Sequence, residues 1–167
     1  MAMAFDLSVR MGLCAGEDRD RVKNHLAACG LQVGLDAIRD AGWSSAELID
    51  LIDHSLPLCD GHTSYNAEPV VKLDELIRKA QGVLIGTPVY NYDASAATKN
   101  LIELTGQAWT NKVVGFLCAA GGSGSYMSIM GLANSLMLDF HCLVIPRFVY
   151  ATEEAFTDGR VRDSEVD

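Results

Sequence analysis

The chain has 167 residues, of which 49% are hydrophobic, and it carries a formal net charge of -9. This length fits one ordinary domain with a single well-filled core, so we expect one domain over residues 1–167. The negative charge and the scattered Lys and Arg residues argue against binding to nucleic acid or to anionic lipid.

The N-terminus, MAMAFDLSVRMGLCAG, lacks the uninterrupted apolar core of a signal peptide, and no stretch approaches the roughly 18 apolar residues of a membrane span. We therefore expect a soluble cytoplasmic protein that does not act at a membrane. The five cysteines lie far apart without C-x-x-C spacing, which favours buried free thiols over a redox or metal site. The four histidines show no metal-binding spacing either, so no metal is expected.

Five strand candidates alternate with helical patterns along the chain, which predicts an α/β fold with right-handed crossovers. The third and fourth candidates are continuous apolar runs, as expected for a parallel sheet with helices on both faces. In chain order the five candidates are 5–15, 46–52, 82–86, 112–120 and 141–150.

Four stripes of apolar residues at three- and four-residue steps predict helices between these strands. They run from Val22 to Ala37, from Leu73 to Ala80, from Ala97 to Leu104 and from Ile129 to Phe140. Pro146 in the fifth strand cannot donate to a ladder, so it favours an edge position. The flavodoxin-like strand order 2-1-3-4-5, a doubly wound five-stranded parallel sheet, places the fifth strand at an edge. The polar tail from about residue 157 is expected to cap that edge or to fray.

Ligands in such sheets bind beyond the carboxyl ends of the strands, where the winding direction changes. The loops that meet there are 15–24, 86–100 and 119–128. The last of these has glycines at 121, 122 and 124 between a strand and a helix, where a ligand can approach the backbone and find free N–H donors. A plain glycine-rich turn is the alternative, because the segment is neither a Walker A motif nor a G-x-G-x-x-G.

The loop GTPVYNYDASAATKN, residues 86–100, is unusually aromatic. Pro88 fixes its own φ and restrains Thr87, which predicts a rigid loop. Tyr90 and Tyr92 are large side chains where a solvated turn normally has small polar ones. They either wall a binding site or pack under neighbouring loops or at a subunit interface.

Four segments together resemble the NADPH-dependent FMN reductase family, flavodoxin-like proteins that include azo, quinone and chromate reductases. TPVYN…KN resembles the family's T-P-x-Y-N…K-N stretch, and AELIDLIDHSLPLCDGH (46–62) resembles its second strand and L-P-L-x-D turn. AAGGSGS is similar to its Gly-Gly loop, and EEAFTDGRVRD (153–163) to its A-F-x-x-D-G-x-x-x-D ending. The segments occur in the right order at the expected spacings and cover nearly the whole chain.

The resemblance implies a site for FMN, with NAD(P)H as co-substrate. It assigns to the loop beside the flavin ring Thr87, Pro88, Val89, Tyr90 and Asn91, and to the ring's other edge and ribityl chain Gly121, Gly122 and Ser123. Lys99 and Asn100 match the family's K-N in the following helix. No acid–base pair is evident, and the chemistry that the resemblance implies requires none.

The first loop departs from the family's G-S-x-R-x-x-S pattern, which holds the FMN phosphate. Gly16 and Arg19 fit the pattern, but Glu17 takes the usual Ser position and Asp18 and Asp20 flank Arg19. Each like-charge pair at about 4 Å costs roughly 1 to 4 kcal/mol, so we expect weaker phosphate binding than the family norm. In the aromatic loop, the usual Pro-Gly is Ser-Ala and the usual Gly after Y-N is Tyr, so that loop keeps its length but not its turn chemistry.

The resemblance implies an FMN-dependent oxidoreductase that passes hydride from NAD(P)H to FMN and then to a flavin, quinone or similar small acceptor. It also implies a homodimer or homotetramer. Two alternatives stay open from the residues: a flavodoxin-like electron carrier or flavin-binding module without NAD(P)H activity, and a degenerate member that has lost FMN.

Overall fold

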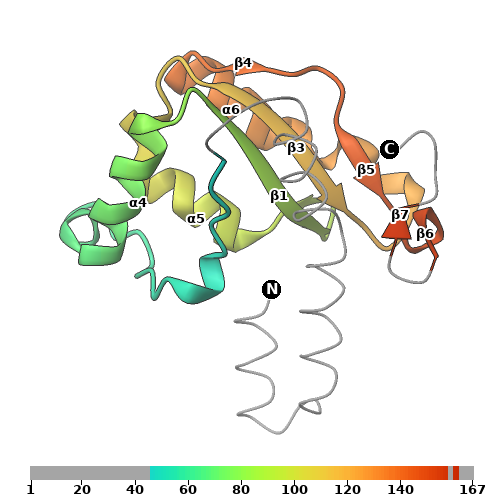
Figure 1. The fold of residues 1–167 in the computed structure, drawn as a ribbon, viewed down its shortest axis with the longest axis horizontal. Helices are drawn as coiled ribbons and strands as arrows, with labels where there is room; N and C mark the ends of the chain where they lie inside the picture. The colour runs from blue at the N-terminus through green and yellow to red at the C-terminus, as the bar shows by residue number, and fades with distance from the viewer. Residues whose placement is uncertain (1–45, 158–159, 162–167) are drawn as a thin grey trace, which may run out of the picture.

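In the computed structural model, which describes residues 46–157 and 160–161, a mostly parallel sheet is covered by α-helices (Figure 1). The order in the sheet is β2-β1-β3, and β3 pairs on its other side with β4 and β5. The helices are α4 (Glu68–Lys79), α5 (Ala96–Thr105) and α6 (Met130–Phe140); the strands are β1 (Gly82–Tyr90), β2 (Asp93–Ala94), β3 (Val113–Ala119), β4 (Leu143–Val144), β5 (Val149–Ala151), β6 (Phe156–Thr157) and β7 (Arg160–Val161). Short 3₁₀ helices lie at Leu51–Asp53, Ser64–Asn66, Gly106–Trp109, Ser123–Ile129 and Glu153–Ala155.

The two central strands direct alternate side chains to opposite faces. β1 and β3 are parallel, with Gly82 opposite Val113 and Pro88 opposite Ala119. Ile85 in β1 and Phe116 in β3 are buried on the same face, at 7% and 2% exposure. The predicted third and fourth strands are thereby confirmed, and β1 continues four residues beyond its predicted end.

All three described α-helices pack on this buried face, since each contributes side chains to one core cluster; in α5 the core residue is Ile102, beside the predicted stripe of Ala97, Leu101 and Leu104. Ile77 of α4, Ile102 of α5, and Leu132 and Leu136 of α6 join Phe116 in that core. Helices were expected on both faces; the predicted helix between Val22 and Ala37, together with the first strand candidate, lies outside the described residues.

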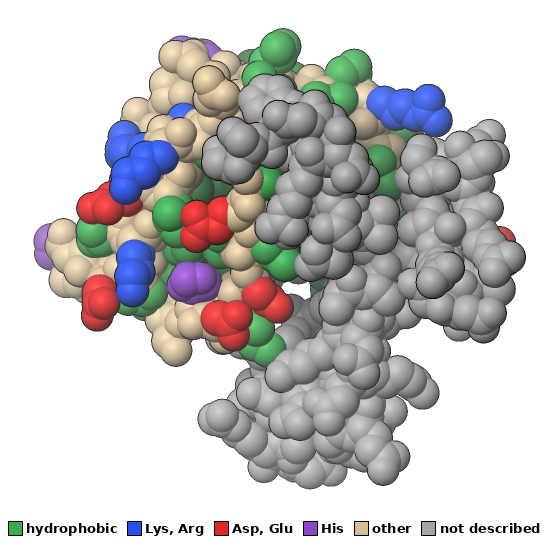
Figure 2. Space-filling model, viewed as in Figure 1, with side chains coloured by type: hydrophobic (Ala, Val, Ile, Leu, Met, Phe, Trp, Pro, Cys, Tyr) green, Lys and Arg blue, Asp and Glu red, His purple; other side chains and the backbone are tan. Residues whose placement is uncertain are grey.

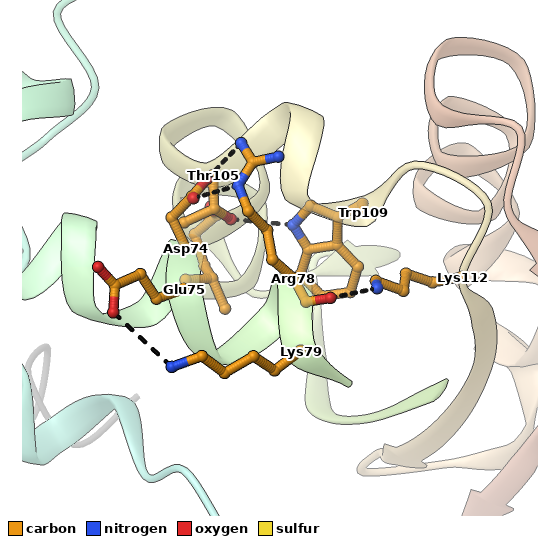
Figure 3. Close-up of polar contacts among 8 residues, drawn as sticks. Asp74, Glu75, Arg78, Lys79, Thr105, Trp109 and Lys112 are labelled. Carbon is orange, nitrogen blue, oxygen red and sulfur yellow. Dashed lines mark hydrogen bonds and ion pairs between the residues drawn. The ribbon is translucent and has the colours of Figure 1, made fainter. Parts of the chain in front are cut away.

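Side chains on the surface of α4 form ion pairs at i,i+4 spacing. Acidic and basic side chains alternate there (Figure 2). The closest pair joins Arg78 Nε to Asp74 Oδ2 at 2.6 Å, and Lys112 Nζ donates to the carbonyl of Arg78 at 2.8 Å (Figure 3). Exposed pairs of this kind contribute about 0–1 kcal/mol each, so the helix is stabilised mainly by its buried face.

The predicted fifth strand forms as two short pieces. β4 pairs with the start of β3 and β5 with its end, and residues 145–148 between them contain Pro146. Proline has no N–H for the ladder, which accounts for the break. Within the described residues this position is an edge of the sheet, as the strand order predicts.

The second predicted strand, 46–52, is wrong as a strand. Residues 46–50 are irregular and Leu51–Asp53 is one turn of 3₁₀ helix. The Asp50 carboxylate accepts a hydrogen bond from the Ile52 N–H at 3.0 Å, so the side chain takes a backbone donor that a strand needs. Near the end of the chain, β6 and β7 form a separate antiparallel pair.

Candidate functional site

The loops after β1 and β3 leave the sheet at the same edge. Their strands are parallel neighbours, and Pro88 at the end of β1 lies opposite Ala119 at the end of β3. The sequence-predicted segments 87–91 and 121–123 therefore stand side by side at the carboxyl ends of two strands (Figure 1). This edge is where open α/β sheets bind ligands.

The aromatic loop is a tight hairpin between β1 and β2. Val89 pairs with Ala94 and Tyr90 with Asp93, which leaves Asn91 and Tyr92 as the two turn residues. Both have positive φ, 50° and 62°. Positive φ at both central residues is the type I′ pattern, which matches the twist of the strands and favours Asn-Gly. Tyr92 is thus in an unfavourable conformation for its residue type, and its side chain is 74% exposed.

A cluster of buried hydroxyl groups fixes this hairpin to α5. Thr98 Oγ1 donates to Thr87 Oγ1 at 2.9 Å, and Ser95 Oγ lies 2.9 Å from Thr98 Oγ1. Thr87 Oγ1 also accepts from the Ser95 N–H at 3.3 Å, and Ser95 Oγ caps the helix by accepting from the Thr98 N–H at 3.3 Å. The sequence pointed to Thr87, but the roles of Ser95 and Thr98 were missed because small hydroxyl residues carry no distinctive spacing.

Tyr90 and the K-N pair have distinct environments. Burial raises the pKa of Tyr90 to about 12, so its phenol is neutral at pH 7. Lys99 is half exposed and pairs with Glu103 at 2.5 Å. Asn100 instead holds another loop: it donates to the Pro57 carbonyl at 2.9 Å and accepts from the Cys59 N–H at 2.9 Å. Asn100 thus ties the L-P-L-C-D turn to α5.

A pocket of about 660 Å³ opens beside the hairpin, within the usual size range of small-molecule sites. It lies between the hairpin, the first turn of α5 and the start of α6. Its lining consists of Tyr90, Asn91, Asp93, Ala94, Ala96, Lys99, Gly131 and Leu132. The hairpin residues of the predicted site therefore border a cavity, whereas Gly121, Gly122 and Ser123 are not among its lining residues.

The glycine loop has open space around its glycines in the described part of the chain. A Cβ built at Gly121, Gly122 or Gly124 would have no atom within 4 Å, and none of these residues has positive φ. Neither backbone conformation nor packing against the described residues therefore requires glycine here. Residues without a Cβ leave room for a ligand at the backbone, which fits the approach of a flavin.

Side chains from β5 and from the loop itself hold this open segment. The Tyr150 hydroxyl lies 2.5 Å from both the Gly122 carbonyl oxygen and Ser125 Oγ. The Ala120 N–H donates to the Ala151 carbonyl at 2.9 Å. The Ser128 hydroxyl is buried without a hydrogen-bond partner in the described part of the chain. Tyr150 could not be predicted as part of the site, because its contact joins β5 to Gly122, 28 residues away along the chain.

The predicted phosphate-binding residues Gly16 and Arg19 lie outside the described residues. Among residues 46–157 and 160–161, no group of three His, Cys, Asp or Glu side chains is placed to hold a metal ion. No helix in the same ranges has the length and apolar character needed to cross a membrane.

Comparisons with known proteins agree with the geometry. The family model of NADPH-dependent FMN reductases matches residues 15–157. The chain is 34% identical over 139 residues to an NAD(P)H-dependent FAD/FMN reductase of Geobacillus thermodenitrificans, covering 81% of this chain and 75% of that protein. It is 31% identical over 117 residues to an NADPH azoreductase of a Bacillus species, covering 69% of this chain and 66% of that protein.

A solved structure supports the fold, and a shorter sequence match is to an enzyme of another class. The flavoenzyme NAD(P)H:(acceptor) oxidoreductase FerB of Paracoccus denitrificans aligns with a TM-score of 0.62 at 24% identity, over 85% of this chain and 80% of that one. A 64-residue stretch is 39% identical to a 3-dehydroquinate synthase of a Ruegeria species, but covers 38% of this chain and 17% of the synthase. That share is too small to carry the synthase's activity to this chain.

Proposed function

The chain belongs to the NADPH-dependent FMN reductase family, and from that premise we propose that the carboxyl edge of β1 and β3 is its flavin site. Family membership makes it an NAD(P)H-dependent oxidoreductase with FMN as cofactor. The finer proposal concerns the residues: Thr87 to Asn91 line one side of the flavin, Gly121 to Ser123 approach the other, and Gly16 and Arg19 meet the phosphate.

The observation that carries this assignment is the open space at the glycine loop. Gly121 and Gly122 have no positive φ and, among residues 46–157 and 160–161, no neighbour that would exclude a Cβ, yet they stand next to the end of β1. Bound FMN would supply hydride transfer from the nicotinamide and onward electron transfer. The chain's own residues bind and orient: backbone groups face the ligand, and the buried hydroxyl cluster keeps the hairpin in place.

We further propose that the electron acceptor is a flavin, a quinone or a similar small molecule. We also propose that the protein is a cytoplasmic homodimer or homotetramer. The pocket beside Tyr90 and Asn91 has the size of a small-molecule site, which supports a small planar acceptor over a protein one. Sedimentation velocity of the purified protein tests the oligomeric state.

The colour of the purified protein tests the function. A yellow preparation that bleaches when NADPH is added under argon, and recovers with a quinone, is the expected result. A yellow preparation that NADPH does not bleach would favour the electron carrier. A colourless protein that takes up no added FMN would identify a member that has lost its cofactor. Arg19→Ala should weaken FMN binding, although a complex should still form when FMN is added to saturation.

A further inference from the structure

The glycine loop is held from β5 by one side chain, Tyr150. Its hydroxyl contacts two atoms of the loop, the Gly122 carbonyl oxygen and Ser125 Oγ, each at 2.5 Å. A phenol has a single proton. Because that proton goes to the Gly122 carbonyl, the Ser125 hydroxyl must donate to the Tyr150 oxygen. The direction of both hydrogen bonds at the Tyr150 hydroxyl is therefore determined.

The bond to Gly122 sets the direction of a peptide group. No peptide bond in the described residues is cis. In a planar trans peptide the carbonyl oxygen and the next N–H point in opposite directions. With the Gly122 carbonyl turned toward Tyr150, the N–H of Ser123 points away from β5. Ser123 is one of the residues proposed above to approach FMN.

The Gly122 carbonyl also leads into the 3₁₀ helix Ser123–Ile129, of which Gly122 is the N-cap. Among the described residues, no atom would lie within 4 Å of a Cβ at Gly121, Gly122 or Gly124, so side-chain packing adds nothing to this restraint. The position of the phenol is itself well determined: Tyr150 pairs with Cys118 of β3 in the sheet, and its ring lies 5.4 Å from that of Tyr126 in an edge-on arrangement. A side chain placed by the sheet thus adds a restraint on the peptide at the start of this 3₁₀ helix.

We propose that Tyr150 is a positioning residue for the flavin site: its hydroxyl locks the Gly122–Ser123 peptide so that the Ser123 N–H is presented as a donor to FMN. The inference rests on the proposed function, because it needs FMN to bind at this loop. It adds a residue that touches the loop and not the ligand.

The test compares Tyr150→Phe with Tyr126→Phe, which removes a hydroxyl from the same aromatic stack. FMN affinity of the apoprotein is measured by quenching of flavin fluorescence, and amide hydrogen exchange of residues 121–125 is measured without FMN. Tyr150→Phe should weaken FMN binding about tenfold, the effect of one lost hydrogen bond, and speed exchange in the loop. Tyr126→Phe should change affinity less than about twofold.

The outcomes separate this inference from the proposed function. If wild-type protein binds FMN and Tyr150→Phe binds it equally well, the positioning role is overturned and the flavin site stands. Equal weakening in both variants, or faster exchange with unchanged affinity, also overturns it. If the wild type binds no FMN, both proposals fall. Should Tyr150→Phe not fold, amide exchange of residues 121–125 in the wild-type apoprotein decides: exchange slower than in an unstructured peptide supports the role of the phenol, and exchange at the unstructured rate overturns it.

Discussion

Ser95 shows how one residue replaces the turn chemistry that the aromatic loop lacks. The family pattern usually has Pro-Gly at the positions that Ser95 and Ala96 occupy in this chain. Ser95 Oγ instead caps α5 and joins the buried hydroxyl groups of Thr87 and Thr98. All three residues are 5% exposed or less. A buried polar group is favourable only when its hydrogen bonds are made, so each member of this cluster depends on the others.

Thr87→Val tests the cluster, because valine keeps the shape of the side chain and removes its oxygen. The Ser95 N–H and the Thr98 hydroxyl would each lose an acceptor inside the protein. We expect a loss of about 1–3 kcal/mol in the free energy of unfolding, measured by urea denaturation. Thr110→Val, at an exposed position, is the control and should change it by less than about 0.5 kcal/mol. Equal midpoints for the two variants would contradict the argument.

Tyr92→Gly should stabilise the protein. Tyr92 has φ of 62°, where a Cβ costs roughly 1–2 kcal/mol, and the change creates the Asn-Gly pair that type I′ turns favour. The added freedom of glycine in the unfolded chain costs about 0.5–1 kcal/mol, so we expect a net gain of up to about 1 kcal/mol and a higher Tm. Tyr92→Ala removes the ring but keeps the Cβ and should give no gain. A lower Tm for the glycine variant would show that the ring itself is stabilising.

At the scale of elements, a glycine within β3 and a glycine just after β3 have different surroundings. Gly115, within β3, is packed: a Cβ there would lie 2.6 Å from Leu84 Cδ2. Gly122, beyond the strand, has φ of -172° and open space around it. The first glycine is therefore explained by folding, whereas the second is one of the residues that we propose to approach the flavin.

Gly115→Ala and Gly122→Ala should consequently separate stability from FMN binding. Gly115→Ala displaces the flexible end of Leu84, which is 41% exposed, and should cost about 1 kcal/mol of stability or less, read from thermal unfolding. Gly122→Ala should unfold within about 0.5 kcal/mol of wild type but bind FMN more weakly in a fluorescence titration. If Gly122→Ala bound FMN with full affinity, the loop would not approach the flavin closely at that residue.

The elements that the sequence predicted well are those with long apolar periods. β1, β3 and the three helices follow from continuous runs and stripes that only a buried sheet and its covering helices explain. Two short elements could not be predicted: the 3₁₀ turn Leu51–Asp53, which Asp50 caps, and the two-residue strand β2. The first depends on a local hydrogen bond, and the second depends on pairing with β1 across a two-residue turn. Asn100 was singled out by its motif, but its contact with Pro57 and Cys59 required the fold.

For the molecule as a whole, the order of its segments was more informative than any one of them. A glycine-rich loop alone is compatible with a plain turn, and an aromatic turn alone with an interface. Parallel pairing of β1 with β3 brings the two to one edge, so their joint occurrence predicts a site that neither predicts separately.

Asp60 should contribute to a loss of the protein's stability on the acid side. Asp60 accepts hydrogen bonds from the Thr63 hydroxyl at 2.5 Å and from the backbone N–H groups of Ser64 and His62. These bonds, led by that of Thr63, hold the pKa of Asp60 well below its usual range. The unfolded chain, with an Asp pKa near 3.9, then binds the proton first, so this stabilisation is complete above about pH 5 and is lost as pH falls below about 4.

Asp60→Asn removes that charge and keeps the size of the side chain. The difference in unfolding free energy between wild type and variant should be constant from about pH 7 to pH 5, and should shrink as pH drops toward 3, because the unfolded wild-type chain then binds a proton at residue 60 that the folded protein does not. Urea denaturation at several pH values measures it. Asp139→Asn, at an exposed position of α6, is the matched control. A wild-type-to-variant difference that stayed constant down to pH 3 would mean that the hydrogen bonds at Asp60 do not favour its charged form.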